Sequence, residues 1–244
     1  MPREVFHALA MAFMLMDHMA WTVFPEAEWL HYIGRLAFPM FAFSCAEGFV
    51  KTRSRTKYII RMTIFAVISE VPFDYMVGYE AFFPYAQNVM FTFTIALCML
   101  TAYEAVYGGR LSIWLKILAI GAIFAAGYAA GELLMTDYGG WGVLTVAAFY
   151  LCGYIADFRA RMVVEVIWMI MVNCWLLPGS GIIVTPAGKI IFPVQGWGIL
   201  ALIPIWLYSG KKALSGKWDT AFKYFGYCFY PLHMLVLSIL AGRL

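Results

Sequence analysis

The chain alternates long apolar stretches with short polar ones over its whole length. A helix needs roughly 20 apolar residues to span a bilayer, and segments of about that length recur here. Several are short or carry polar residues, which is typical of tilted, broken or re-entrant spans. The pattern predicts about nine spans, at residues 5–24, 34–50, 58–78, 88–107, 112–134, 140–156, 162–177, 195–209 and 224–242.

Composition excludes a soluble domain. Of the 244 residues, 64% are hydrophobic and 13% are charged, whereas a soluble domain carries about 25% charged residues. We therefore expect an all-α, polytopic transmembrane helical bundle that forms one domain over residues 1–244. The first apolar segment is expected to be a retained helix, because Asp17 and His18 interrupt it and no small-residue cleavage site follows.

The positive charges test this map of spans. With the N-terminus in the cytoplasm, fourteen of the seventeen Lys and Arg residues fall on inner segments, and only Arg35, Lys189 and Arg243 fall outside. Such an excess of Lys and Arg in cytoplasmic segments sets the orientation of a membrane protein. The net charge of +3 thus follows from topology and gives no reason to expect a nucleic-acid partner.

Small residues inside the spans predict packing rather than chemistry. Gly127 and Gly131 form a GxxxG pattern, which lets a neighbouring backbone approach closely. The five cysteines all lie in apolar segments without metal-ligand spacing, so we expect thiols that serve helix packing, with neither disulfides nor a metal site. They are Cys45, Cys98, Cys152, Cys174 and Cys228.

Ionisable side chains at membrane depth are costly, and they commonly mark functional sites. Given the predicted orientation, such residues from several spans share the outer half of the bundle. A structural alternative is a neutralised network that only holds the helices together. The residues of this layer are Asp17, His18, Arg35, Glu70, Asp74, Asn88, Asp137 and Tyr138.

Asp17 and His18 cannot point the same way, because adjacent residues on a helix diverge by about 100°. We expect His18 to face a substrate cavity, where it could act as a general base, and Asp17 either to pair with Arg35 or to hold a neighbouring helix. Nucleophile-elbow, Walker and HExxH motifs are missing from the sequence, which argues against ATP-driven transport and zinc proteolysis.

A basic run follows the second span on the predicted cytoplasmic side. It admits two interpretations: the positive-inside rule alone, or a docking surface for an anionic cytosolic cofactor. Glu47 precedes this run, and His233 is expected in the inner half of the last span. The run comprises Lys51, Arg53, Arg55, Lys57 and Arg61.

Taken together, these residues resemble the TraX family, whose founding members acetylate the N-terminus of conjugative pilin subunits. The resemblance covers nearly the whole chain in the expected order. It lies in residues 16–18 (MDH), 33–43 (IGRLAFPMFAF), 46–49 (AEGF), 52–53, 57–58, 68–74 (ISEVPFD), 88–92 (NVMFT), 137–139, 142–144 and 229–233 (FYPLH).

The family is similar in turn to transmembrane acyltransferases that include the acyltransferase-three proteins, in which a histidine of the first helix and a nearby arginine are the catalytic hallmark. That likeness implies His18 as general base and Arg35 as its charge-stabilising partner. It also implies an enzyme of the bacterial cytoplasmic (inner) membrane that transfers an acyl group, acetyl above all, from cytosolic acyl-CoA to a hydroxyl or amine at the outer side.

The resulting expectations are specific. The acceptor is left open between a peptide or pilin, a sugar and an envelope glycan. A proton-coupled transporter that uses the same Asp/Glu/His/Arg network is the alternative, and an assembly scaffold is a third reading. The expected catalytic set is His18, Asp17, Arg35, Glu70, Asp74 and Asn88. The expected donor-binding set is Lys51, Arg53, Arg55, Lys57, Arg61, Glu47, Tyr138 and His233.

Overall fold

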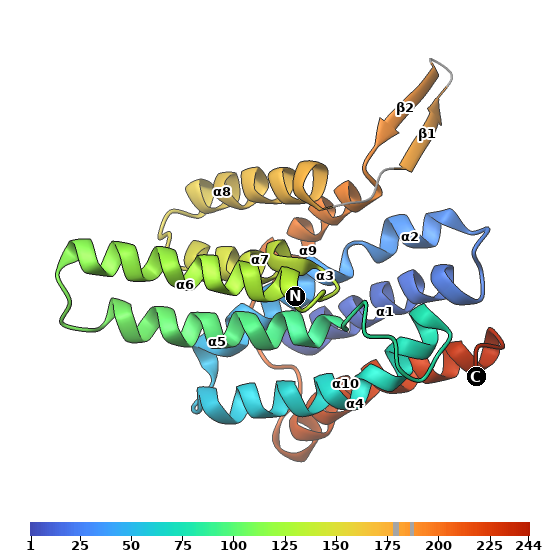
Figure 1. The fold of residues 1–244 in the computed structure, drawn as a ribbon, viewed down its shortest axis with the longest axis horizontal. Helices are drawn as coiled ribbons and strands as arrows, with labels where there is room; N and C mark the ends of the chain where they lie inside the picture. The colour runs from blue at the N-terminus through green and yellow to red at the C-terminus, as the bar shows by residue number, and fades with distance from the viewer. Residues whose placement is uncertain (178–180, 186–187) are drawn as a thin grey trace.

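Helices dominate the computed structural model, which describes residues 1–177, 181–185 and 188–244 (Figure 1). A two-stranded antiparallel hairpin, β1 (Gly181–Thr185) with β2 (Gly188–Phe192), is the other regular element of that part of the chain. A π-helical turn (Val172–Leu176) and a 3₁₀ helix (Val194–Ala201) flank the hairpin. The α-helices are α1 (Arg3–Thr22), α2 (Glu28–Gly34), α3 (Ala37–Lys51), α4 (Arg55–Gly78), α5 (Val89–Tyr107), α6 (Ile113–Leu133), α7 (Gly139–Cys152), α8 (Phe158–Met171), α9 (Leu202–Trp206) and α10 (Gly216–Leu240).

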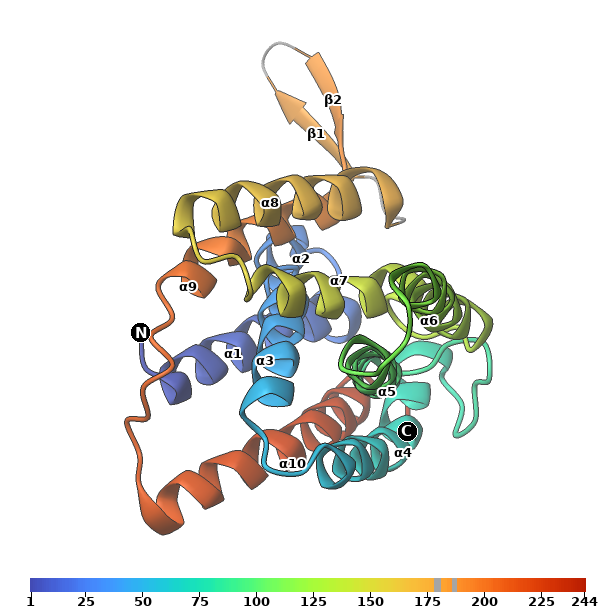
Figure 2. The ribbon, with the colours of Figure 1, turned by 90° about the vertical axis from the view of Figure 1, so that its left-hand side faces the viewer.

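The helical bundle predicted from the sequence is confirmed, with three local differences. Helix α2 was not expected, because its residues Glu28–Gly34 mix polar and apolar types. Helix α10 begins at Gly216, several residues before the predicted position 224. The hairpin Gly181–Phe192 was not expected either, and it projects from the bundle (Figures 1 and 2). The number of nine spans stays a prediction.

Membrane-spanning character is strongest in a few helices. Within the described residues, three helical stretches are long and apolar enough to cross a membrane: Glu28–Lys51, Val89–Tyr107 and Ile113–Leu133. Helix α6 is the most outward-facing of them, since Gly127 and Gly131 are its only buried residues. A helix that is apolar all round and exposes nearly all its side chains is stable in lipid rather than in water.

The same two glycines explain how α6 joins the bundle. A Cβ atom at Gly131 would lie 2.7 Å from backbone atoms of Gly139, at the start of α7, and one at Gly127 would lie 2.3 Å from the Met99 sulfur of α5. Position 131 therefore excludes a larger residue because it meets backbone, whereas at position 127 the flexible Met99 side chain would have to shift. The close backbone approach predicted from the GxxxG pattern is confirmed at Gly131.

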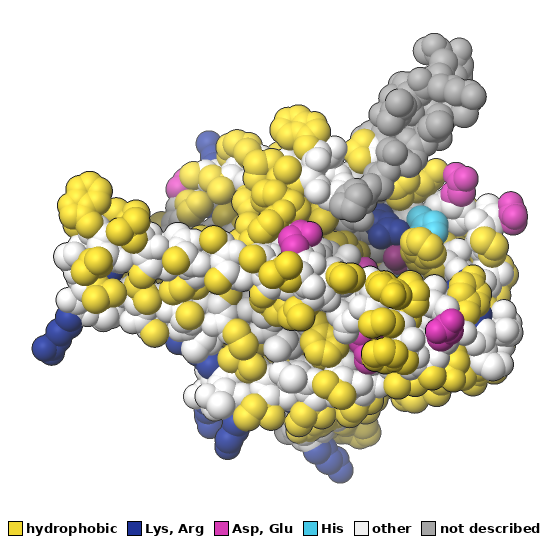
Figure 3. Space-filling view, viewed as in Figure 1, with side chains coloured by type: hydrophobic (Ala, Val, Ile, Leu, Met, Phe, Trp, Pro, Cys, Tyr) yellow, Lys and Arg dark blue, Asp and Glu magenta, His cyan; other side chains and the backbone are white. Residues whose placement is uncertain are grey.

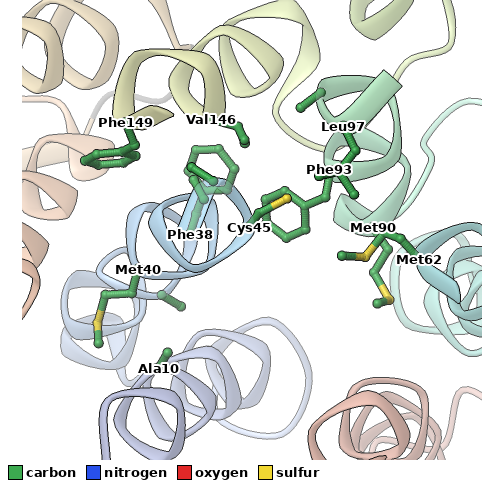
Figure 4. Close-up of a cluster of buried hydrophobic side chains, with 14 of the residues drawn as sticks. Ala10, Phe38, Met40, Cys45, Met62, Met90, Phe93, Leu97, Val146 and Phe149 are labelled. Atoms are coloured by element: carbon green, nitrogen blue, oxygen red, sulfur yellow. The ribbon is translucent and has the colours of Figure 1, made fainter. Parts of the chain in front are cut away.

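Apolar side chains fill the centre of the bundle, where α1 and α3 lie between α4 with α10 on one side and α8 with α9 on the other (Figure 2). Since lipid is as apolar as leucine, tight packing rather than exclusion of water holds such helices together. Methionines suit this role because they adapt to irregular gaps. Figure 4 shows part of the cluster: Ala10, Phe38, Met40, Cys45, Met62, Met90, Phe93, Leu97, Val146 and Phe149.

Charge separates the two ends of the bundle. Arg3 at the start of α1 forms an ion pair with Asp219 in the first turn of α10, and Arg55 at the start of α4 pairs with Glu104 near the end of α5. On the face in Figure 3, Lys and Arg gather mainly at the left-hand end and underside, and acidic side chains mainly toward the right. We call these the basic end and the opposite end; the compartment that each faces stays a prediction.

Candidate functional site

A cavity of about 260 Å³ opens in the half of the bundle away from the basic end. We call it the His18 cavity. Aromatic rings such as Phe38, Phe73 and Phe93 form much of its wall, and polar groups from two helices and two connecting segments converge on it. Those polar residues are Asp17 and His18 of α1, Arg35 after α2, Asp137 and Tyr138 before α7, and Tyr230 of α10.

Asp17 and Arg35 form an ion pair, which is one of the two roles that the sequence left open for Asp17. The Asp17 Oδ1 atom lies 3.4 Å from Arg35 Nη2 and 3.0 Å from Nδ1 of His31 in α2. The Arg35 Nη1 atom donates to Gln195 Oε1 at 3.4 Å, and the Gln195 amide donates in turn to Asn173 Oδ1 at 3.2 Å. Partners on both sides thus fix the direction of the guanidinium group.

Glycine at position 34 makes this ion pair possible. A Cβ atom there would lie 2.4 Å from the Asp17 Cβ atom and 2.7 Å from its Cα atom. The end of α2 is therefore pressed directly against α1 at Asp17. Because Arg35 follows at once, the close contact delivers its guanidinium group to the Asp17 carboxylate.

His18 has a different partner, His233 of α10. The His18 Nδ1 and His233 Nε2 atoms are 2.6 Å apart, and His233 Nδ1 lies 2.7 Å from the Phe229 carbonyl oxygen. We expected His233 in the donor-binding set, and the structure corrects this. His233 lines neither of the cavities described here, and it contacts His18 from outside the His18 cavity. His31, which the sequence did not single out, is likewise part of the site through Asp17.

Three residues expected in the catalytic set do not line the His18 cavity. Asp74 accepts a hydrogen bond from the Phe83 backbone N–H at 3.0 Å, and Glu70 accepts from the Asn88 side chain. The Asn88 amide also donates to the Ala66 carbonyl, while its oxygen caps α5. These contacts tie α4 to the start of α5, so Glu70, Asp74 and Asn88 support the scaffold instead of facing the cavity.

Tyr138 lies at the His18 cavity rather than among the basic residues where we expected a donor-binding group. Its ring stacks on Phe38, with the ring centroids 3.6 Å apart. Tyr138 and Asp137 are also close enough to Arg35 to interact with it electrostatically. The hydroxyl of Tyr138 is therefore available near the guanidinium group.

A second cavity, of about 370 Å³, opens at the basic end; we call it the basic-end cavity. Of the expected donor-binding residues, Lys51, Arg61 and Glu47 line it, whereas the other three of the basic run do not. Arg55 pairs with Glu104 instead, and Arg53 and Lys57 are exposed. The sequence missed two further cations of its lining, Arg3 of α1 and Lys223 of α10, because both are far from the basic run in the chain.

The two cavities abut. Five residues line both of them, and we call these the shared wall: Met14, Phe41, Val89, Phe93 and Tyr230. The shared wall therefore lies between the cations of the basic end on one side and His18 and Arg35 on the other. The arrangement suits a long, flexible molecule with an anionic head and a reactive tail.

Comparisons with known proteins agree with one another. The family model described as TraX protein matches residues 2–241. "Probable fimbrial assembly protein FimC, serogroup H1" of Dichelobacter nodosus is 29% identical, over 94% of this chain and 91% of its own. "Protein TraX" of Escherichia coli K12 is 27% identical, over 98% of this chain and 87% of its own. No solved structure matches the chain.

Proposed function

The chain belongs to the TraX family, and on that premise we propose that it is a membrane-embedded acyltransferase. It would move an acyl group, acetyl in the first instance, from cytosolic acyl-CoA to a hydroxyl or amine at the other side of the bacterial cytoplasmic membrane. The observation that carries this proposal is the pair of adjoining cavities, because only the shared wall lies between a cationic mouth and His18 with Arg35.

The basic-end cavity supports binding of the donor. Arg3, Lys51, Arg61 and Lys223 are distributed around it, and Arg and Lys are the residues that bind phosphate groups most effectively. Tyr227 adds an aromatic surface beside Arg61, whose Nε atom donates to the tyrosine hydroxyl at 3.2 Å. In this proposal the phosphates stay at the mouth while the pantetheine arm passes the shared wall and presents the thioester to His18.

The His18 cavity supports the chemistry. His18 takes the proton of the acceptor hydroxyl or amine while the acceptor atom attacks the thioester carbonyl carbon. Arg35 stabilises the oxyanion that forms, helped by Tyr138. The Nε atom of Arg35 is buried and has no hydrogen-bond partner among the described residues. The carbon–sulfur bond then breaks, and the departing thiolate takes the proton from His18.

The names of the relatives bear on the acceptor. One relative is named for fimbrial assembly, which favours a protein subunit of a surface appendage over a sugar or an envelope glycan. Such a subunit would reach the His18 cavity from the end opposite the cations.

Mass spectrometry tests the proposed function. We expect an acyl mass shift in membrane or secreted material from cells that make the protein, and none from cells that make His18→Ala at the same level. We also expect acetyl-CoA to raise the melting temperature of the purified wild type and of His18→Ala alike. An unchanged mass shift with His18→Ala would refute the role of His18. Proton flux in liposomes without CoA, together with no mass shift in wild-type cells, would favour the transporter.

A further inference from the structure

We propose that His233 is a positioning residue that sets the tautomer and orientation of His18, so that the Nε2 atom of His18 faces the reacting groups as the base. This inference rests on the proposed acyl transfer and deepens it. The adjacent Asp17 would be the obvious orienting group in the sequence. In the structure its carboxylate is bound to His31 and Arg35.

The direction of each hydrogen bond follows from the chemistry of the partners. A carbonyl oxygen can only accept, so His233 Nδ1, 2.7 Å from the Phe229 oxygen, carries the proton. Neutral His233 then has a lone pair on Nε2, which lies 2.6 Å from His18 Nδ1. His18 Nδ1 must therefore donate, and the proton-accepting nitrogen of neutral His18 is Nε2.

The charged alternative is disfavoured. A cationic His233 could donate from both nitrogens, but His233 is only 6% exposed. No carboxylate contacts it within the described part of the chain. A buried cation without a counter-ion is costly, so the neutral arrangement prevails.

Ring geometry makes the contact a true hydrogen bond. The two imidazole planes are only 7° apart, with centroids 4.8 Å from each other. Parallel rings with nitrogens 2.6 Å apart cannot lie face to face, because that spacing is shorter than a van der Waals contact. They meet edge to edge, with the His18 N–H directed at the His233 lone pair.

The structure also holds His233 still. Its ring stacks on Phe229, at 11° between planes and 4.9 Å between centroids, and the bond to the Phe229 carbonyl fixes the remaining nitrogen. His18 is less buried than His233 and lines the cavity. Its Nε2 atom has no hydrogen-bond partner among the residues that the structure describes. One nitrogen of His18 is thus engaged, and the other is free for the acceptor proton.

This pairing bears on the transfer step. When His18 Nε2 takes the acceptor proton, the ring becomes a cation, and its Nδ1–H bond to His233 strengthens because donors with a positive charge bond more strongly. His18 later returns the same Nε2 proton to the departing thiolate. His233 gains and loses no proton through the cycle, so its contribution is orientation and stabilisation of the cation.

Two variants separate this role from simple packing. His233→Phe keeps a flat ring against Phe229 but removes the acceptor nitrogen, and His233→Gln places an amide oxygen near the position of Nε2. With labelled acetyl-CoA as donor and membrane vesicles as the source of acceptor, we expect His233→Phe to lower the saturated rate by about 10²-fold. The acetyl-CoA concentration at half-maximal rate should stay unchanged, and His233→Gln should recover a large part of the rate.

Nitrogen-15 NMR of histidine-labelled protein gives a second readout that does not depend on activity. With His18 assigned by its loss in His18→Gln, we expect a proton on Nδ1 in the wild type and in His233→Gln, and loss of that preference in His233→Phe. A wild-type His18 protonated on Nε2, or equal rates in His233→Phe and the wild type, would overturn the inference. If the wild type transfers no acetyl group, the proposed function fails, and the spectra still decide whether His233 sets the tautomer.

Discussion

The His18 cavity and the basic-end cavity meet at the shared wall but hold their charged groups in different ways. Around the His18 cavity, Asp17 is 9% exposed, and Arg35 is bound on two sides by Asp17 and Gln195. At the basic end, Lys51 pairs with Glu47 at 2.6 Å, yet its side chain is 54% exposed, and Lys223 is exposed as well. The charged groups of one cavity are buried in mutual contacts, and those of the other lie on long side chains that reach solvent.

The difference matches two kinds of task. Groups that act on a transition state must be held in place before the reaction, because reorganisation at that moment costs rate. Cations that hold a mobile phosphate group gain from adaptable side chains and long-range attraction. We therefore expect changes at the His18 cavity to alter stability or the maximal rate, and changes at the basic end to alter donor affinity.

Filling the contact between α1 and α2 should have the largest effect. Gly34→Val would drive new atoms into Asp17, since even a Cβ atom would lie 2.4 Å from the Asp17 Cβ. Overpacking of this kind costs about 1–3 kcal/mol, and here it also displaces Arg35. We expect a lower melting temperature and loss of acetyl transfer, measured by thermal unfolding in detergent and by the vesicle assay.

Gly121→Val is the matched control for that change. A Cβ atom at Gly121 in α6 would meet no atom within 4 Å, so the added side chain should point into lipid. We expect near wild-type stability and rate. A Gly34→Val protein that matches Gly121→Val in both measurements would contradict the close contact between α1 and α2.

Arg35→Lys should have the next largest effect. Lysine keeps the charge but loses the forked donor geometry that lets Arg35 reach Asp17 and Gln195 together. We expect a fall of roughly 10²-fold in the saturated rate, the order seen when one donor to an oxyanion is lost. The acetyl-CoA concentration at half-maximal rate should not move. A change confined to that concentration would place Arg35 in donor binding.

Arg61→Gln should change the acetyl-CoA concentration at half-maximal rate and not the saturated rate. Arg61 lines the basic-end cavity, and loss of one phosphate contact should raise the acetyl-CoA concentration at half-maximal rate by about tenfold, the equivalent of 1.4 kcal/mol. The saturated rate should hold. Lys57→Gln removes an exposed cation of the same run that does not line the cavity, and it should leave both quantities unchanged.

Added salt should have the smallest effect on acetyl transfer, and it separates donor binding at the basic end from the reaction at the His18 cavity. Attraction between exposed charges is screened over about 10 Å at 0.1 M ionic strength, while buried pairs are screened much less. Raising the salt concentration should therefore weaken acetyl-CoA binding a few-fold and leave the saturated rate nearly constant. A saturated rate that falls in step with binding would mean that the Asp17–Arg35 pair is open to solvent.

Sequence patterns foresaw much of the scaffold and part of the site. Apolar periodicity placed the helices, and the GxxxG pattern at Gly127 and Gly131 foresaw the close contacts of α6. The pairing of Asp17 with Arg35 was one of the two roles that the sequence left open for Asp17. The sequence did not show that Glu70 and Asp74 do not line the His18 cavity. Residues at the same depth in the bundle can face different sides of their helix, and the sequence does not say which side faces the cavity.

By itself the sequence determined the all-helical, apolar bundle and the gathering of most Lys and Arg residues at one end, because these depend on local composition and on the cost of charge in lipid. Only the tertiary structure decided that the partner of His18 is His233, 215 residues away, and not its neighbour Asp17. It alone also decided that five residues from four helices line both cavities. The physical reason is that helices far apart in sequence pack against each other, and that packing selects which side chains meet.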